Sequence, residues 1–486
     1  MTRRRPFFLL LWVVVQGCAA QQVAPTAGRP VTPAPPAQAA SSIRFLASYP
    51  ATLLYALDAV AGERNRDAGY RQWIVGDGQA PWLDAYAERR RGWGEAMRSD
   101  HGGGAPAFEV CGWEAQDLED AIRCIEGVVN EQDRPAAVAA IREADRRLRP
   151  RWTELGAHMI AMLPELEKEL RTAKAAGLFR TLRSEAGLAA NAPLNFNVIL
   201  VAKPPGSHSF ARQAGQFLVH EVGPDETVGG LLAIAFHEIA HLAHFMSPQR
   251  QEMERAFLRH GDSGRIAASV WDEVVATAFG NGLAADQLDP EFRVDRSFYT
   301  DRWVDKLGRA LYREWKAGLD VRLGPELAAH LVQLTDREWP EDQRPVARYL
   351  WYVTIHAQER AIAREALRGV EYRSASRMTP IEDGIPSGPE LPPWAPRLVL
   401  ITADDLAQRA ALVVRAGIPP RSWEAALSGS DAAVFRHDDA DGAVVFVIVA
   451  RNGDALRAAA PTFARLPRMV SAGWTPLSAR SSPQIR

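Results

Sequence analysis

Three histidines and one glutamate stand close together in the otherwise apolar segment AFHEIAHLAHF, residues 235–245. Residues four apart on an α-helix share one face, so His237 and His241 can direct their ring nitrogens to a single point. Zn²⁺ accepts two imidazoles, one more protein ligand and a water, the open coordination of a hydrolytic site. Glu238 lies beside the two histidines, where a general base for that water is needed. The alternative is a buried helix whose imidazoles hydrogen-bond to backbone or water.

The pattern H-E-x-x-H resembles the motif of the zincin metallopeptidases. A metzincin continues with a glycine and a further histidine, but His244 and Ser247 occupy those two positions. The resemblance therefore excludes the metzincin branch and points to the gluzincin, thermolysin-like branch. In that branch the third metal ligand is a glutamate on a later helix.

Glu273, in the segment VWDEVVATAF, fits the gluzincin pattern, because the small residue Ala276 follows three positions later and allows close helix packing. Its apolar neighbours place the carboxylate near a core, where it needs a compensating cation. The resemblance implies a zinc site of His237, His241 and Glu273. Other acidic residues and one histidine stay open as the third ligand: Asp272, Glu252, Glu254 and His260.

The third histidine of the motif, His244, follows His241 by one turn and His237 by two. It therefore shares their face, but it lies about 10 Å of helix rise from His237. One tetrahedral zinc does not easily span that distance. We expect His244 to support the ligands or to end the helix rather than to bind the metal.

Gluzincins also use a tyrosine or histidine that hydrogen-bonds the developing oxyanion. The sequence predicts a helix over RPVARYLWYVTIHAQERAIAREAL, residues 344–367, with Tyr349, Tyr352 and His356 on one face. Tyr352 and His356 are therefore the candidates for this role, and an aromatic core stripe is the alternative. The segment GQFLVHEV, residues 215–222, is expected to be the edge strand that pairs with an extended peptide. His220 within it could face either way.

The hydrophobic patterns predict an α+β fold that is mainly helical, with a small sheet beside the helix that carries the motif. That helix is expected to begin after a cap at Asp225 or Thr227 and to end at Ser247. The predicted organisation is a signal peptide at 1–18, a tether at 19–42, a helical N-terminal region at 43–190, a zincin-like core at 191–372, a linker at 373–396 and a small α+β domain at 397–486.

The N-terminus MTRRRPFFLLLWVVVQGCAA has a basic start, a short apolar run and small residues around Cys18, as in a signal peptide. The residues before Cys18 resemble the bacterial lipobox, which implies acylation of this cysteine and a lipid anchor in the cell envelope. Simple cleavage to a freely secreted protein is the alternative. The Pro- and Ala-rich segment 19–42 cannot bury enough apolar surface to fold. In an exported chain Cys111 and Cys124 can form a disulfide, and two free buried thiols are the alternative.

The chain has 486 residues, 47% of them hydrophobic and 24% charged, with a formal net charge of -2. This balance gives no electrostatic reason to expect nucleic-acid binding. The resemblance implies an exported zinc metallopeptidase that acts on a peptide or protein substrate. A catalytically silent zincin-fold binding lipoprotein and a non-peptidase zinc hydrolase are the alternatives, and the sequence does not indicate an oligomeric state.

Overall fold

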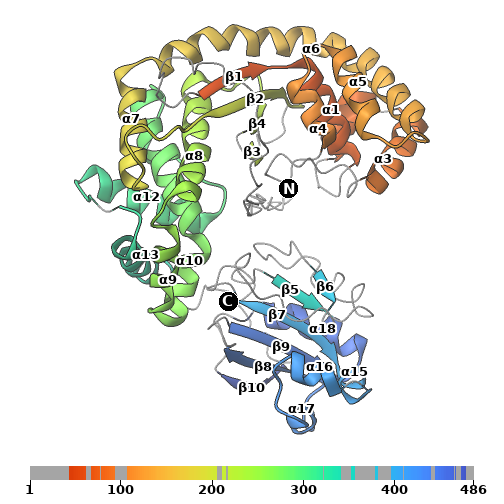
Figure 1. The fold of residues 1–486 in the computed structure, drawn as a ribbon, viewed down its shortest axis with the longest axis vertical. Helices are drawn as coiled ribbons and strands as arrows, with labels where there is room; N and C mark the ends of the chain where they lie inside the picture. Colours follow the sequence, from red (N-terminus) through yellow and green to blue (C-terminus); the bar gives the residue numbers. More distant parts are fainter. Residues whose placement is uncertain are drawn as a thin grey trace, which may run out of the picture.

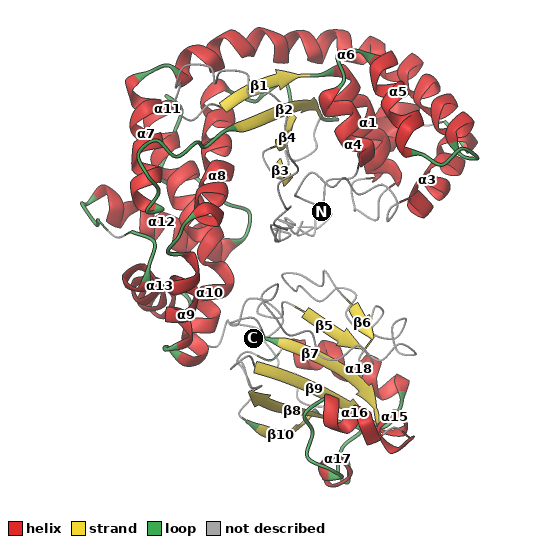
Figure 2. Cartoon of the chain, in the orientation of Figure 1, coloured by secondary structure: helices red, strands yellow, loops and turns green. Residues whose placement is uncertain are grey.

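A computed structural model gives the fold in Figures 1 and 2. It describes residues 43–61, 67–76, 78–93, 107–204, 211–214, 217–320, 322–340, 352–355, 378–380, 396–408, 410–438, 444–464, 466 and 472–477. The segments predicted to be a signal peptide and a tether, with Cys18, lie outside the described residues. The α+β, mainly helical fold class is confirmed, because helices dominate and two small sheets accompany them.

The first sheet has four strands in the order β1-β2-β4-β3. Strands β1, β2 and β4 are parallel, and β3 is antiparallel to β4. Nearly every residue of β2 and β4 is buried, which is typical of parallel strands covered on both faces. The bounds of the strands are β1 (Ile43–Ala47), β2 (Phe196–Ala202), β3 (Ala211–Ala214) and β4 (Phe217–Val222).

Helices surround this sheet and share one hydrophobic core with it, which extends from Ile43 to Trp339. The long helix α6 arches along the sheet in Figure 1, with Pro150 and Pro164 inside it. The helices of this part are α1 (Tyr49–Ala61), α2 (Asp67–Val75), α3 (Pro81–Trp93), α4 (Ala107–Glu114), α5 (Leu118–Val128), α6 (Arg134–Leu170), α7 (Ala173–Glu185), α8 (Val228–Met246), α9 (Arg250–Leu258), α10 (Gly261–Ala276), η1 (Thr277–Ala284), α11 (Ala285–Leu288), α12 (Arg302–Lys316) and α13 (Pro325–Glu338).

The expectation that residues 215–222 form an edge strand is wrong. The described part of this segment, Phe217–Val222, is β4, and it pairs with β2 on one side and β3 on the other. The short strand β3, which the sequence pattern did not indicate, takes the outer position. His220 is buried within β4, and its ring nitrogens have no hydrogen-bond partner among the described residues.

The second sheet has six strands in the order β10-β8-β9-β7-β5-β6. Neighbouring residues of β7 and β9 alternate between two cores, so helices cover both faces of the sheet. Its elements are β5 (Tyr352–Ile355), β6 (Met378–Pro380), β7 (Arg397–Thr402), α15 (Ala403–Gln408), α16 (Ala410–Arg415), α17 (Ser422–Ala426), β8 (Ala432–Asp438), β9 (Val444–Ala450), α18 (Gly453–Ala464) and β10 (Gly473–Pro476).

The predicted helix over residues 344–367 is wrong at Tyr352, which begins strand β5. That strand pairs in parallel with β6 and β7 of the second sheet. The four residues YVTI include three β-branched side chains, and so short a run fits a strand as well as a helix. Tyr349 and His356 lie outside the described residues. Strand β6 falls within the segment predicted as a linker, 373–396.

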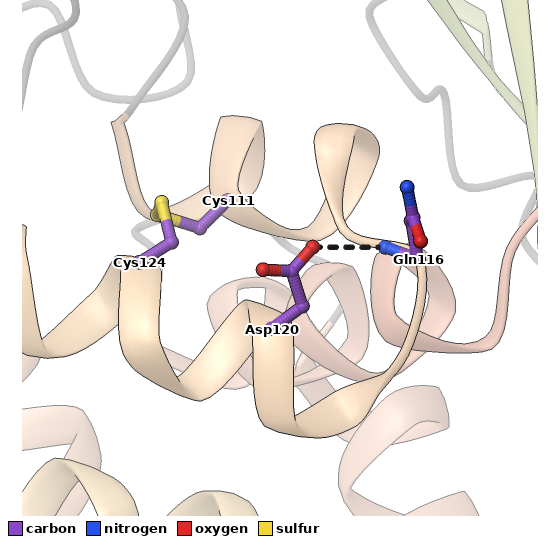
Figure 3. Close-up of a disulfide and its surroundings, with 4 residues drawn as sticks. All are labelled: Cys111, Gln116, Asp120 and Cys124. Atoms are coloured by element: carbon purple, nitrogen blue, oxygen red, sulfur yellow. Dashed lines mark hydrogen bonds between the residues drawn. A yellow bond between two sulfur atoms is a disulfide. The ribbon is translucent and has the colours of Figure 1, made fainter.

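A disulfide joins Cys111 of α4 to Cys124 of α5 (Figure 3), and their Cα atoms are 5.5 Å apart. The backbone N–H of Gln116, in the connection between the two helices, donates to a carboxylate oxygen of Asp120. The bridge therefore ties two consecutive helices across a short connection. Of the two alternatives that the sequence left open for these cysteines, the structure shows the pair.

Candidate metal centre

Helix α8 carries the histidine motif through the centre of the first core. Its N-terminus is capped by Thr227, whose hydroxyl accepts a hydrogen bond from the backbone N–H of Gly230. It ends at Ser247, as the sequence predicts. Of the described helices, α8 alone is long and apolar enough to cross a membrane, but 72% of its most apolar window is buried inside the protein. We therefore interpret α8 as a core helix.

The second helix of the site runs without interruption from residue 261 to residue 288 as α10, η1 and α11. Its middle part, η1, is a π-helix, a wide form that is rare and often lies at functional sites. Glu273 occupies the last turn of α10 before this segment. The helix change therefore falls directly beside the carboxylate that the sequence predicts as a ligand.

Gly280 of η1 allows the two helices to come unusually close. A Cβ atom added at this glycine would lie 2.4 Å from both N and Cα of His237. No side chain can occupy that space, so the backbone of η1 packs directly on the backbone of α8 at the first histidine. This contact sets how far Glu273 stands from the motif.

The structure brings His237, His241 and Glu273 together at one buried point. The two Nε2 atoms are 3.2 Å apart. Oε2 of Glu273 lies 3.6 Å from Nε2 of His237 and 3.7 Å from Nε2 of His241. The three atoms thus form a nearly equilateral triangle, contributed by two helices.

The dimensions of this triangle fit a metal ion. Bonds of about 2.0–2.2 Å, as in zinc sites, hold tetrahedral ligand atoms about 3.3–3.6 Å apart. The two imidazole nitrogens also face each other, and a shared cation satisfies both lone pairs where at most one hydrogen bond could form. The buried histidine and glutamate side chains can therefore hold a metal ion.

Asp272 contacts the opposite ring edge of His241. Its Oδ2 atom lies 3.0 Å from Nδ1 of His241, and its Oδ1 atom lies 2.6 Å from Nδ1 of His244. A proton on Nδ1 of His241 leaves the Nε2 lone pair free to face the triangle. Asp272 is therefore placed to orient a ligand rather than to replace Glu273 in the triangle, although with His241 and His244 it forms a second group of side chains that could hold a metal ion.

The carboxylates around the site shift the pKa values of its imidazoles. Burial alone would lower the pKa of His241, but Asp272 and Glu273 outweigh it and raise this pKa to about 10. Burial would likewise raise the pKa of Asp272, but the imidazoles of His241 and His244 hold it well below its usual value. The cluster carries a surplus of negative charge, which favours a bound cation.

Glu238 is buried next to the triangle, and its Oε2 atom has no hydrogen-bond partner among the described residues. Burial raises the pKa of Glu238; the imidazoles of His237 and His241 oppose this shift, and the carboxylate of Glu273 adds to it. A carboxylate with a raised pKa is suited to accept a proton and to release it again.

Tyr299 is a residue of the site that the sequence reasoning missed. Its hydroxyl donates to Oε2 of Glu273 over 2.9 Å, and its ring stacks on His237 with centroids 5.9 Å apart. The backbone N–H groups of Phe298 and Tyr299 donate to the buried carboxylate of Asp305, which holds the loop in place. No spacing rule connects this loop, between α11 and α12, to the motif.

Of the two predicted oxyanion donors, Tyr352 lies in β5 of the second sheet and His356 lies outside the described residues. The described structure therefore does not bring either residue to the triangle. Tyr299, whose hydroxyl donates to Glu273, is a tyrosine that the described structure does place at the triangle.

Comparisons with protein-family models, with curated proteins and with solved structures gave no match to this chain. The geometry and chemistry of the site are therefore the basis for the function proposed below.

We predict that Gly280→Ala lowers the free energy of unfolding by about 1–3 kcal/mol, because the added methyl group forces η1 away from His237. The same displacement moves Glu273 and weakens metal binding. Chemical denaturation and metal competition measure the two effects. Gly127→Ala in α5 is the matched control, because no atom lies within 4 Å of its added Cβ. Equal stability and metal affinity of the two variants would contradict the role given to Gly280.

Proposed function

We propose that this protein is a zinc-dependent hydrolase of gluzincin type that cleaves peptide bonds. The observation that carries the proposal is the triangle of His237, His241 and Glu273 with the buried carboxylate of Glu238 beside it, whose Oε2 atom has no hydrogen-bond partner among the described residues. Two imidazoles and one carboxylate are a ligand set of hydrolytic zinc sites that leaves a position for water. When bound there, zinc lowers the pKa of water and polarises a substrate carbonyl.

Glu238 is the general base in this proposal. It accepts the proton of the attacking water and then delivers it to the leaving amine. Its burial supports this role, because the raised pKa makes the second transfer easier. The hydroxyl of Tyr299 donates its single proton to Glu273 in the structure, and in the proposed reaction it turns to donate to the oxygen that becomes negative as the carbonyl is attacked.

The proposed substrate is a peptide or protein. The outer strand β3, Ala211–Ala214, has β4 on only one side in the described sheet, and an extended peptide can pair with the other side. The proposed location is the bacterial cell envelope, with a lipid anchor at Cys18. The Cys111–Cys124 disulfide supports export, because such bridges persist in oxidising compartments.

The central test is Glu238→Gln. We expect near-stoichiometric zinc in the wild type and in the variant, because Glu238 is not a ligand, and a loss of kcat of about 100-fold or more in the variant. Elemental analysis and cleavage of a peptide library measure the two quantities. Glu109→Gln, a buried glutamate on α4, is the matched control that should keep both. Folded wild-type protein without zinc would refute the proposal, and zinc without cleavage would favour the binding lipoprotein.

Tyr299→Phe should lower kcat by about 100-fold with little change in KM, because the variant loses one hydrogen bond to the developing oxyanion. Zinc content should stay at the wild-type level. Tyr312→Phe removes another tyrosine hydroxyl, one that pairs with Lys316 instead of a ligand, and should leave kcat unchanged. A wild-type kcat in Tyr299→Phe would remove this residue from the mechanism.

A further inference from the structure

The proposed chemistry leaves the third histidine of the motif without a role. We infer that His244 is a positioning residue for the metal site, which acts through Asp272 to hold the imidazole of His241, and that Glu185 holds His244 in turn. This inference rests on the proposed zinc function and assigns a task to two buried side chains outside the triangle.

Each carboxylate oxygen of Asp272 contacts a different histidine. Oδ1 lies 2.6 Å from Nδ1 of His244, and Oδ2 lies 3.0 Å from Nδ1 of His241. A carboxylate that makes one contact can rotate about its Cβ–Cγ bond, whereas two contacts on separate oxygens fix its plane. His244 thus determines the direction from which Asp272 approaches the ligand.

His244 is itself buried between a hydrogen-bonded carboxylate, an aromatic ring and a second, more distant carboxylate. It is 1% exposed, and its ring lies 5.4 Å from that of Trp271. Its Nε2 atom faces Oε2 of Glu185 at 3.6 Å, an ion-pair distance that is longer than a hydrogen bond. Glu185 is buried at the end of α7, so a third helix joins the network.

The same contacts exclude His244 as a ligand of the triangle. Its Nδ1 atom is occupied by Asp272, and its Nε2 atom faces Glu185. If His244 bound the metal of the triangle, Asp272 or Glu185 would lose its imidazole partner. A carboxylate that is left without a partner in the protein interior lowers the free energy of unfolding. His241 is the member of the network with one nitrogen toward Asp272 and the other toward the metal position.

Loss of the His244 contact releases Oδ1 of Asp272, so that His241 loses its fixed tautomer and orientation. Removal of a group that orients a ligand typically weakens metal binding about 10–100-fold. We therefore expect His244→Leu to raise the Kd for zinc about 10–100-fold. His244→Asn should keep most of the affinity, because its amide can donate from the position of Nδ1.

The test measures zinc Kd of the full chain by chelator competition and records the visible spectrum of the Co²⁺-substituted protein. His220→Leu is the matched control: His220 is equally buried, at 1% exposed, but its nitrogens have no hydrogen-bond partner in the part of the chain that the structure describes. We expect His244→Leu to change both the affinity and the spectrum. His244→Asn and His220→Leu should change neither appreciably.

The single variant Asp272→Asn covers the case in which His244→Leu does not fold. Asp272→Asn is nearly isosteric and should weaken zinc binding to a similar extent. If His244→Leu folds, adding it to Asp272→Asn should weaken binding little further, because both act through one carboxylate.

Wild-type zinc affinity in His244→Leu, or in Asp272→Asn, would overturn the inference. Equal losses in His244→Leu and His220→Leu would also overturn it, because they would reflect general destabilisation. These outcomes leave the proposed function intact if the wild type binds zinc and cleaves peptides. Wild-type protein that binds no zinc instead refutes the proposed function itself.

Discussion

The site depends on the backbone contact between η1 and α8 at Gly280. The geometry of helix α8 alone directs the ring nitrogens of His237 and His241 to one point. The third corner of the triangle, Glu273, comes from a helix more than thirty residues later in the chain. Only a glycine permits the two backbones to meet at His237. The position of Glu273 is therefore a consequence of helix packing, and the chemistry of the site depends on that packing.

Burial creates the second constraint. Four carboxylates, those of Glu185, Glu238, Asp272 and Glu273, lie within or beside a mostly apolar core. Their described contacts near the triangle are imidazoles and the hydroxyl of Tyr299. Charges in such a place need compensation, which a divalent cation and a histidine with a carboxylate at each nitrogen can provide. The same need for charge compensation explains why Asp272, His244 and Glu185 form a network of charged groups next to His241.

Local features of the site could be predicted from the sequence, because they follow from helix periodicity. The cap at Thr227, the end at Ser247 and the shared face of His237 and His241 are of this kind. The pairing with Glu273 required a resemblance, since tertiary packing decides it. Tyr299 lies on a loop and has no periodic signal. Tyr352 was assigned to a helix because it shares three- and four-residue spacing with Tyr349 and His356, and a strand of four residues within such a segment has no distinct periodic signal.

The most direct measurement is anomalous diffraction at the zinc absorption edge from crystals of the zinc-loaded protein. Our account predicts one strong peak about 2.0–2.2 Å from Nε2 of His237, Nε2 of His241 and Oε2 of Glu273. A peak that contacts Asp272 and His244 instead, or no peak in the triangle of a well-folded chain, would contradict it.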